Sequence, residues 1–302
     1  MQLFNFMIDK RTGIGAEFNG ERIDFSRAWA IWRTLDNNTV YPPLNSIDAM
    51  LARGLFTKSA IDQVLQTIEG CSPEVRTSLK LGGDWKWATP VLKPGKIVAL
   101  VQNYRKHAEE FGNQAPDKLV FFAKFPSTMI PQGGEIVFPG WLNSRVDHEV
   151  ELGVVIGKTC QNVGADTALD YVGGYTILND VSARHTQKEL RDASMPWMPS
   201  KNVDTFCPVG PYLVPHDTVD NAQCLRIACK VNGTMRQEGN TEDMLHPIPK
   251  IISDLSRSLT LEPGDIIATG TPEGVSKISI GDNVECEIDG LGVLQSKVVA
   301  AR

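Results

Sequence analysis

The feature that most restricts the fold of this chain is a series of short strand-like segments after about residue 90, with few helices between them. These segments are rich in β-branched residues, and Asn232-Gly233 and Asp289-Gly290 are typical hairpin turns between them. A doubly wound sheet would alternate strands with helices, and a dinucleotide fold would carry G-x-G-x-x-G after a strand, which this sequence lacks. We therefore predict a mixed, β-rich α+β fold. The expected strands and hairpins are 97–101, 151–157, 173–182, 225–236, 264–271 and 283–299.

The first ninety residues have a different pattern. Short apolar segments alternate there with two helix-like stretches, 46–54 and 58–70, the first capped by Ser46. We predict a boundary near residue 90, with one small domain over residues 1–90 and a larger domain over residues 91–302, which the resemblance described below identifies as accessory and catalytic. One amphipathic helix is expected in the second unit, with Pro247 and Pro249 in or before its first turn. Its apolar residues recur at helical spacing: Leu245, Ile248, Ile251, Ile252, Leu255 and Leu259.

Charge, cysteines and hydropathy exclude several classes of protein. With 36 acidic and 30 basic side chains the net charge is -6, which argues against a nucleic-acid partner. Six scattered cysteines without a C-x-x-C pair predict reduced thiols rather than a disulfide scaffold. The sequence shows no membrane-spanning apolar stretch and no signal-peptide pattern at residues 1–13. We expect a cytoplasmic protein with no membrane partner.

The strongest local signal for chemistry is Glu149 and Glu151, which precede an apolar strand. Side chains two apart on a strand share a face, so two carboxylates meet there. A solvated sheet edge is one explanation. A buried pair would instead need a cation, and Mg²⁺ prefers oxygen ligands of this kind. Asp180, at the end of the strand at 174–179, is either a third ligand or a turn residue.

Polar residues after Asp180 indicate a site for an anionic, oxygen-rich ligand, although an exposed polar helix would show the same pattern. They are Ser182, Arg184, Gln187, Trp197 and Lys201.

Two further segments are candidates for the site. On a helix, His107 and Glu110 would lie at i and i+3, as a general-base pair or as a surface ion pair. Thr271 lies in a glycine-bracketed loop, 269–275, whose amides could approach a carboxylate or simply form a turn.

Together these residues resemble the fumarylacetoacetate hydrolase family over about residues 90–300. Six blocks carry the resemblance, in order: NYRKHAEE, KFPST, DHEVELGVVIGK, GGYTILNDVSAR, PWMPSKNVDTFCPVGP and GDIIATGTPEGV. The resemblance implies a rolled β-sheet catalytic domain, a homodimer, and, in members with an N-terminal extension, a small accessory domain.

The resemblance also implies roles for single residues. Glu149, Glu151 and Asp180 would hold a divalent ion, Mg²⁺ with Mn²⁺ and Ca²⁺ as alternatives. His107 and Glu110 would activate water on a segment that closes over the substrate, and Lys201 would stabilise an oxyanion. The implied substrate-binding residues are Tyr104, Lys124, Arg184, Gln187 and Thr271.

Two positions depart from the family pattern. Relatives usually have a glycine shortly before the first Asn-Tyr, where this chain reads Leu100-Val101-Gln102, and an aspartate is common at the position of His185. The first departure concerns the backbone that leads into the segment of His107, and the second the charge near the site.

The predicted activity is hydrolysis of a carbon–carbon bond in a small anionic β-diketo acid of the acylpyruvate or fumarylpyruvate kind, as in the breakdown of aromatic compounds. The ion would act as a Lewis acid, and His107 with Glu110 would activate the attacking water. The same site could serve other enolate chemistry. The alternatives are a decarboxylase or isomerase of an oxo-diacid, a dehydratase or hydrolase of a sugar-derived keto acid, and a non-catalytic metal-stabilised binding protein.

Overall fold

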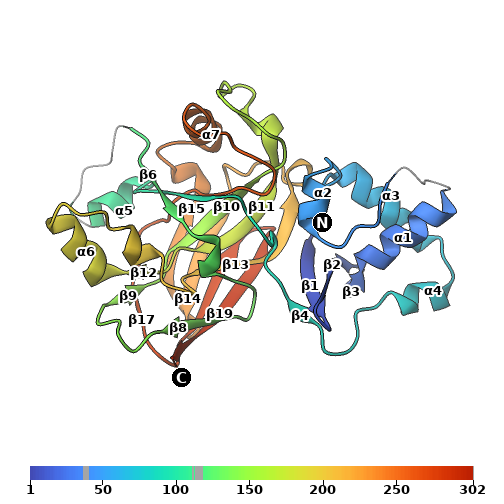
Figure 1. Ribbon diagram of the computed structural model, residues 1–302, viewed down its shortest axis with the longest axis horizontal. Helices are drawn as coiled ribbons and strands as arrows, with labels where there is room; N and C mark the ends of the chain where they lie inside the picture. Colours follow the sequence, from blue (N-terminus) through green and yellow to red (C-terminus); the bar gives the residue numbers. More distant parts are fainter. Residues whose placement is uncertain (37–40, 111, 113–117, 302) are drawn as a thin grey trace.

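The computed structural model describes residues 1–36, 41–110, 112 and 118–301. Within these residues the chain forms an eleven-stranded mixed sheet, a five-stranded sheet and a three-stranded sheet (Figure 1). The central strands of the large sheet are mostly antiparallel, β10 with β11 and β11 with β13, while β16 runs parallel to β5. This arrangement confirms the predicted β-rich mixed fold.

The chain after residue 90 contains the following elements. The large sheet has β5 (Ile97–Leu100), β6 (Phe121–Lys124), β7 (Met129–Ile130), β10 (Val150–Ile156), β11 (Val172–Asn179), β13 (Cys207–Pro215) and β16 (Ile266–Ala268). The five-stranded sheet has β8 (Glu135–Phe138), β14 (Arg226–Val231), β15 (Thr234–Asn240), β18 (Asn283–Ile288) and β19 (Gly292–Ala300). The small sheet has β9 (Val146–Asp147), β12 (Ser182–Ala183) and β17 (Lys277–Ile278). The α-helices are α5 (Arg105–Glu110), α6 (Arg184–Asp192) and α7 (Ile248–Ser256), and the 3-10 turns are Pro126–Thr128, Ala168–Tyr171, Met198–Lys201, His216–Thr218 and Thr241–Asp243.

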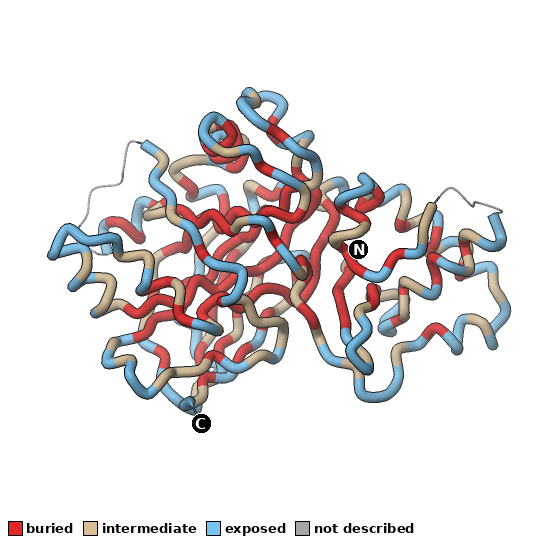
Figure 2. The backbone as a smooth tube through the Cα atoms, viewed as in Figure 1, coloured by how far each residue is buried: buried red, intermediate tan, exposed pale blue. Residues whose placement is uncertain are grey.

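The N-terminal part extends the same large sheet. Strand β1 pairs antiparallel with β13, with Leu3 opposite Leu213, and β2 and β3 continue from it. Buried residues therefore run from the central strands into this part of the molecule (Figure 2). Its elements are β1 (Leu3–Ile8), β2 (Arg11–Phe18), β3 (Glu21–Asp24), α1 (Phe25–Leu35), α2 (Ile47–Leu51), α3 (Lys58–Glu69), α4 (Pro73–Ser78) and β4 (Lys86–Trp87). The division at residue 90 stays a prediction.

Local sequence signals account for most of these boundaries. Ser46 Oγ accepts a hydrogen bond from Ala49 N–H at 3.2 Å and caps α2. Helix α7 begins after Pro247, its N-cap, so the prolines lie where no helical N–H is required. Asn232 and Gly233 both have positive φ, as a two-residue hairpin turn demands. The predicted helices and hairpins are confirmed at these positions.

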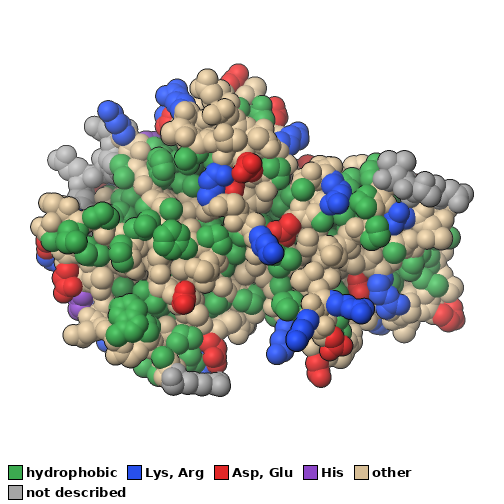
Figure 3. All heavy atoms as spheres, viewed as in Figure 1, with side chains coloured by type: hydrophobic (Ala, Val, Ile, Leu, Met, Phe, Trp, Pro, Cys, Tyr) green, Lys and Arg blue, Asp and Glu red, His purple; other side chains and the backbone are tan. Residues whose placement is uncertain are grey.

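The surface carries charges of both signs. On the face shown in Figure 3, Lys and Arg side chains lie interspersed with Asp and Glu rather than gathered in one basic area. Among the described residues, no helix is both long and apolar enough to cross a bilayer.

Candidate metal centre and active site

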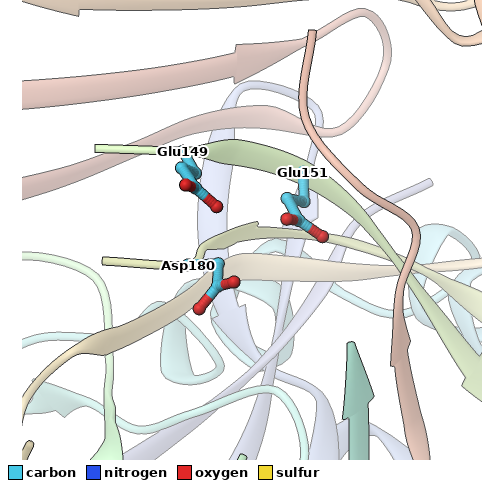
Figure 4. A group of neighbouring side chains, drawn as sticks. All are labelled: Glu149, Glu151 and Asp180. Atoms are coloured by element: carbon cyan, nitrogen blue, oxygen red, sulfur yellow. The ribbon is translucent and has the colours of Figure 1, made fainter. Parts of the chain in front are cut away.

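Three buried carboxylates meet at the start of β10. Glu149 immediately precedes this strand, Glu151 lies within it, and Asp180 follows the neighbouring strand β11. Val150 pairs with Asn179, so the two strand ends bring the side chains together. One oxygen from each carboxylate lies within 4.8 Å of the others, and the three side chains are neighbours in Figure 4. Because none is more than 4% exposed, a solvated sheet edge does not explain this cluster.

Basic side chains surround part of this cluster. Lys201 Nζ lies 2.7 Å from Glu149 Oε2 and 2.5 Å from Asp180 Oδ2, and Lys124 Nζ lies 2.8 Å from Asp180 Oδ1. Arg184 pairs with Glu149 and with the buried Asp147. Lys124 also donates to the backbone oxygens of Lys201 and Phe206 at 2.6 and 3.1 Å.

The surrounding charges shift the pKa values of Glu149 and Glu151 in opposite directions. Burial opposes the charged form of Glu149, but Lys201 and then Arg184 hold its pKa well below the usual range. Burial raises the pKa of Glu151 well above its usual value, and the charges of Asp180 and Glu149 raise it further. Glu151 accepts a hydrogen bond from Gly270 N–H at 2.7 Å.

This donor set fits a hard divalent ion. Three buried carboxylates offer the oxygen ligands that Mg²⁺, Mn²⁺ and Ca²⁺ prefer. A dication would also stabilise the charged form of Glu151, which its neighbours now oppose. The chain therefore has an acidic metal site formed by Glu149, Glu151 and Asp180.

A cavity of about 360 Å³ opens onto this cluster. Its walls combine apolar and basic side chains, a suitable lining for a small anion. The residues that line it are Leu100, Val101, Gln102, His107, Phe122, Glu149, Glu151, Arg184, Gln187, Arg191, Trp197, Lys201 and Thr271.

His107 and Glu110 lie on α5 with the predicted helical spacing. His107 is 6% exposed and lines the cavity, so it is no surface residue, and its Nδ1 lies 3.4 Å from Glu110 Oε2. Gly274 N–H points at both Glu110 carboxylate oxygens at 3.3 Å, which ties α5 to the loop at 269–275. The role of the pair as a general base stays a prediction.

The substrate-binding candidates divide into two groups. Arg184, Gln187 and Thr271 line the cavity. Tyr104 and Lys124 are not part of its lining: Tyr104 is buried beside the cluster, and the contacts of Lys124 are those that hold Asp180 and the backbone around Lys201. Burial, with the charges of Glu151 and Asp243, raises the pKa of Tyr104.

The two positions that depart from the family pattern, at Gln102 and at His185, have different consequences. Gln102 adopts φ +52, in the left-handed region where a glycine would be unstrained, and it lines the cavity. His185 is an exposed residue of α6 and accepts a hydrogen bond from Arg145 N–H at 3.3 Å. It therefore contacts the segment before β9 and is not part of the cavity lining.

Phe122 and Arg191 line the cavity but were not predicted as site residues from the sequence. Arg191 follows Gln187 by four positions on α6, which places both on the same side of the helix. That spacing was visible in the sequence, but many exposed helices carry arginine at such positions.

Comparison with known proteins agrees with this site. A family profile described as the fumarylacetoacetate (FAA) hydrolase C-terminal domain matches residues 96–299. The chain belongs to the fumarylacetoacetate hydrolase family. The match covers the metal site, the cavity lining and α5.

Relatives within the fumarylacetoacetate hydrolase family carry different activities in their names. The human mitochondrial oxaloacetate tautomerase is 41% identical over 217 residues, 70% of this chain and 68% of the relative. The mitochondrial oxaloacetate decarboxylase of Dictyostelium discoideum is 42% identical over 197 residues, 65% of this chain and 89% of the relative. A solved maleylpyruvate hydrolase from Sphingobium sp. SYK-6, in complex with manganese(II) and pyruvate, is 30% identical with a TM-score of 0.74 and full coverage of both chains.

Proposed function

We propose that this chain is a metal-dependent enzyme that interconverts the keto and enol forms of a small 2-oxo dicarboxylate of the oxaloacetate type. The observation that carries the proposal is that His107, whose Nδ1 lies 3.4 Å from Glu110 Oε2, lines the same cavity as the buried carboxylates Glu149 and Glu151. Tautomerisation needs a base beside an electrophilic site, and needs no other reactant. The relatives named for oxaloacetate chemistry support this substrate class more than the predicted acylpyruvates.

His107 would take a proton from the carbon next to the 2-oxo group. The electron pair of that bond forms the carbon–carbon double bond, and the imidazolium of His107 then gives the same proton to the 2-oxo oxygen, which completes the enol and restores the neutral base. Glu110, 3.4 Å from the imidazole, stabilises the imidazolium while it holds the proton. The reverse transfers regenerate the keto form, so atoms and charge balance.

The basic residues of the cavity would bind the two carboxylates. Lys201 supplies positive charge at the centre of the site, where negative charge develops on the substrate oxygen. Arg191 lies on the wall formed by α6, and among the described residues its ion pair is a loose one, with Asp192 at 3.9 Å, so we expect its guanidinium to bind the far carboxylate. A divalent ion on Glu149, Glu151 and Asp180 would supply Lewis-acid polarisation of the 2-oxo group.

Hydrolysis of a β-diketo acid is the second candidate. It is supported by the solved maleylpyruvate hydrolase, which aligns over the whole of both chains, and by the same His107–Glu110 pair acting on water. Decarboxylation of an oxo-diacid uses the same charges but requires no base.

One experiment distinguishes these activities. Purified protein with Mg²⁺ or Mn²⁺ is incubated with enol-oxaloacetate, keto-oxaloacetate and an acylpyruvate, and the products are identified by proton NMR. We expect faster keto–enol interconversion without net consumption. Pyruvate as the main product would favour decarboxylation, cleavage of the acylpyruvate would favour hydrolysis, and no change with any of them would reject the proposed function.

A further inference from the structure

We propose that Gln237 is a positioning residue that fixes the hydroxyl group of Thr271, so that Thr271 donates its hydrogen to an anionic ligand in the cavity. The identity of that ligand, a 2-oxo acid or its enolate, rests on the proposed function. The orientation of the hydroxyl rests on the hydrogen bonds around Gln237.

Gln237 differs from its neighbours on β15. Arg236 and Glu238 are exposed, whereas the Gln237 side chain turns inward and is 1% exposed. A buried amide is costly unless its oxygen and its nitrogen both find partners. Those partners lie on the two segments that build the active site, the approach to β10 and the loop at 269–275.

The backbone determines which end of the amide faces which segment. Val150 N–H can only donate, and it points at Gln237 Oε1 at 3.2 Å. The Pro272 carbonyl oxygen can only accept, and it receives a hydrogen bond from Gln237 Nε2 at 2.8 Å. A flipped amide would lose both bonds, so the observed orientation is required by chemistry.

This orientation decides the direction of the Thr271 hydrogen bond. The second hydrogen of Gln237 Nε2 points at Thr271 Oγ1 at 2.8 Å, so the hydroxyl oxygen accepts. The hydroxyl hydrogen must then lie away from Gln237. Because Thr271 is only 2% exposed and lines the cavity, that hydrogen is directed to a ligand rather than to bulk solvent.

Further contacts hold the amide in place. His148 Nδ1 lies 2.9 Å from Gln237 Oε1, and His148 Nε2 lies 2.9 Å from Ser276 Oγ. Since Oε1 is only an acceptor, His148 must carry a hydrogen on Nδ1. A Cβ on Gly239 would lie 2.8 Å from Pro272 Cβ, so β15 approaches the loop closely where Gly239 has no side chain. Gln237 thus holds the Thr271 hydroxyl in a fixed position relative to β15.

The test measures binding of oxalate, a planar dianion that resembles the enolate of a 2-oxo acid, to the Mn²⁺-loaded protein by calorimetry. Thr271→Val removes the hydroxyl, and Gln237→Glu and Gln237→Met both remove the amide donor, the second without adding charge. We expect each of the three to weaken oxalate binding about tenfold or more, because a hydrogen bond to a charged ligand is lost. Thr271→Ser keeps the hydroxyl and should bind like the wild type.

A double variant, Gln237→Met with Thr271→Val, distinguishes a positioning role of Gln237 from a purely structural one. If Gln237 acts through Thr271, Gln237→Met should cost no further affinity in the Thr271→Val background, and Mn²⁺ affinity should stay unchanged throughout. The inference is overturned if folded Gln237 variants bind oxalate within twofold of wild type, if the two losses add, or if both Gln237 variants unfold. This readout does not require turnover, so inactivity toward oxaloacetate would reject the proposed function and leave this test valid.

Discussion

At the scale of single residues, the site depends on how the buried basic groups are distributed among the buried carboxylates. Lys201 bridges Glu149 and Asp180, Arg184 adds a second cation to Glu149, and Glu151 lies between the like charges of the other two. A positive ligand is therefore favoured at the carboxylates, while the cavity beyond them is basic and favours an anion. An acidic chain can in this way bind an acidic substrate.

Arg191 gives a test of substrate class. Arg191→Gln should raise KM for oxaloacetate about tenfold and change KM for a 2-oxo monocarboxylate little, because only the dicarboxylate loses an ion pair. Steady-state kinetics with both acids measure the difference. Lys188→Gln is the matched control, since Lys188 is an exposed cation on the same helix and pairs with Asp192. Equal effects of the two substitutions would show that Arg191 acts only through overall charge.

His216 gives a test of stability against pH. Its Nδ1 lies 2.8 Å from the Tyr175 hydroxyl, and burial lowers its pKa although Asp217 and Asp170 raise it. Because the folded state binds a proton at His216 less well than the unfolded chain does, neutral His216 contributes to the unfolding free energy above its unfolded pKa of about 6.5. That contribution is lost as the pH falls through the lowered pKa of the folded state. Urea unfolding between pH 7.5 and pH 5.5 should therefore show a smaller loss of unfolding free energy for His216→Gln than for wild type. Parallel curves for the two proteins would contradict this.

Several site residues could be predicted from the sequence because the chemistry lies in short segments. Spacing singles out Glu149 with Glu151, and His107 with Glu110, as candidates, and the resemblance to the family then assigns their roles. Gln237 and Arg191 could not be found in this way. The first is an ordinary polar residue on an exposed-looking strand, and only the pairing of β14 with β15 turns it inward.

At the scale of elements, the loop at 269–275 holds the site together. It contacts Glu151 through Gly270, Gln237 through Thr271 and Pro272, and Glu110 through Gly274. Gly274 has φ +93, and a Cβ there would lie 2.2 Å from the Arg236 carbonyl oxygen. Both the backbone conformation and the close approach to β15 thus require glycine.

Gly274→Ala should therefore lower both stability and activity. We expect a loss of more than about 2 kcal/mol in unfolding free energy, from the strained φ and the backbone clash together, with a fall in kcat as the loop shifts. Chemical denaturation and an activity assay measure the two effects. Gly281→Ala is the control: its φ is +99 but a Cβ there meets nothing within 4 Å, so it carries the strain without the clash. Equal losses for both variants would mean that the packing of the loop on β15 is unimportant.

Element prediction succeeded where caps and periodicity agree, as in α2, α3 and α7. It missed α1, which begins after the N-cap Asp24. The aromatic residues of that helix, Phe25, Trp29 and Trp32, have modest helix propensity, and their burial against the N-terminal strands stabilises it instead. This stabilisation of α1 comes from tertiary packing, which cannot be predicted from the local sequence of the helix.

At the scale of the whole molecule, the first ninety residues and the catalytic sheet share a hydrophobic core. Leu3, Ile14 and Trp29 belong to the same buried cluster as Val155 and Leu213. We therefore expect the full chain to unfold in one cooperative transition, with calorimetric and van't Hoff enthalpies in agreement. Two separate transitions in differential scanning calorimetry would show that the accessory part folds on its own. The predicted homodimer is a separate question, for sedimentation analysis.

The most direct measurement of the central claim follows enol-oxaloacetate by its ultraviolet absorbance in the presence of Mg²⁺-loaded protein. We predict that wild type accelerates the loss of the enol, that chelation of the metal abolishes the acceleration, and that His107→Gln lowers kcat about 10² to 10⁴-fold with metal affinity retained. His185→Gln should behave like wild type, because His185 is exposed and does not line the cavity. Undiminished turnover by His107→Gln, or no acceleration by metal-loaded wild type, would contradict the account.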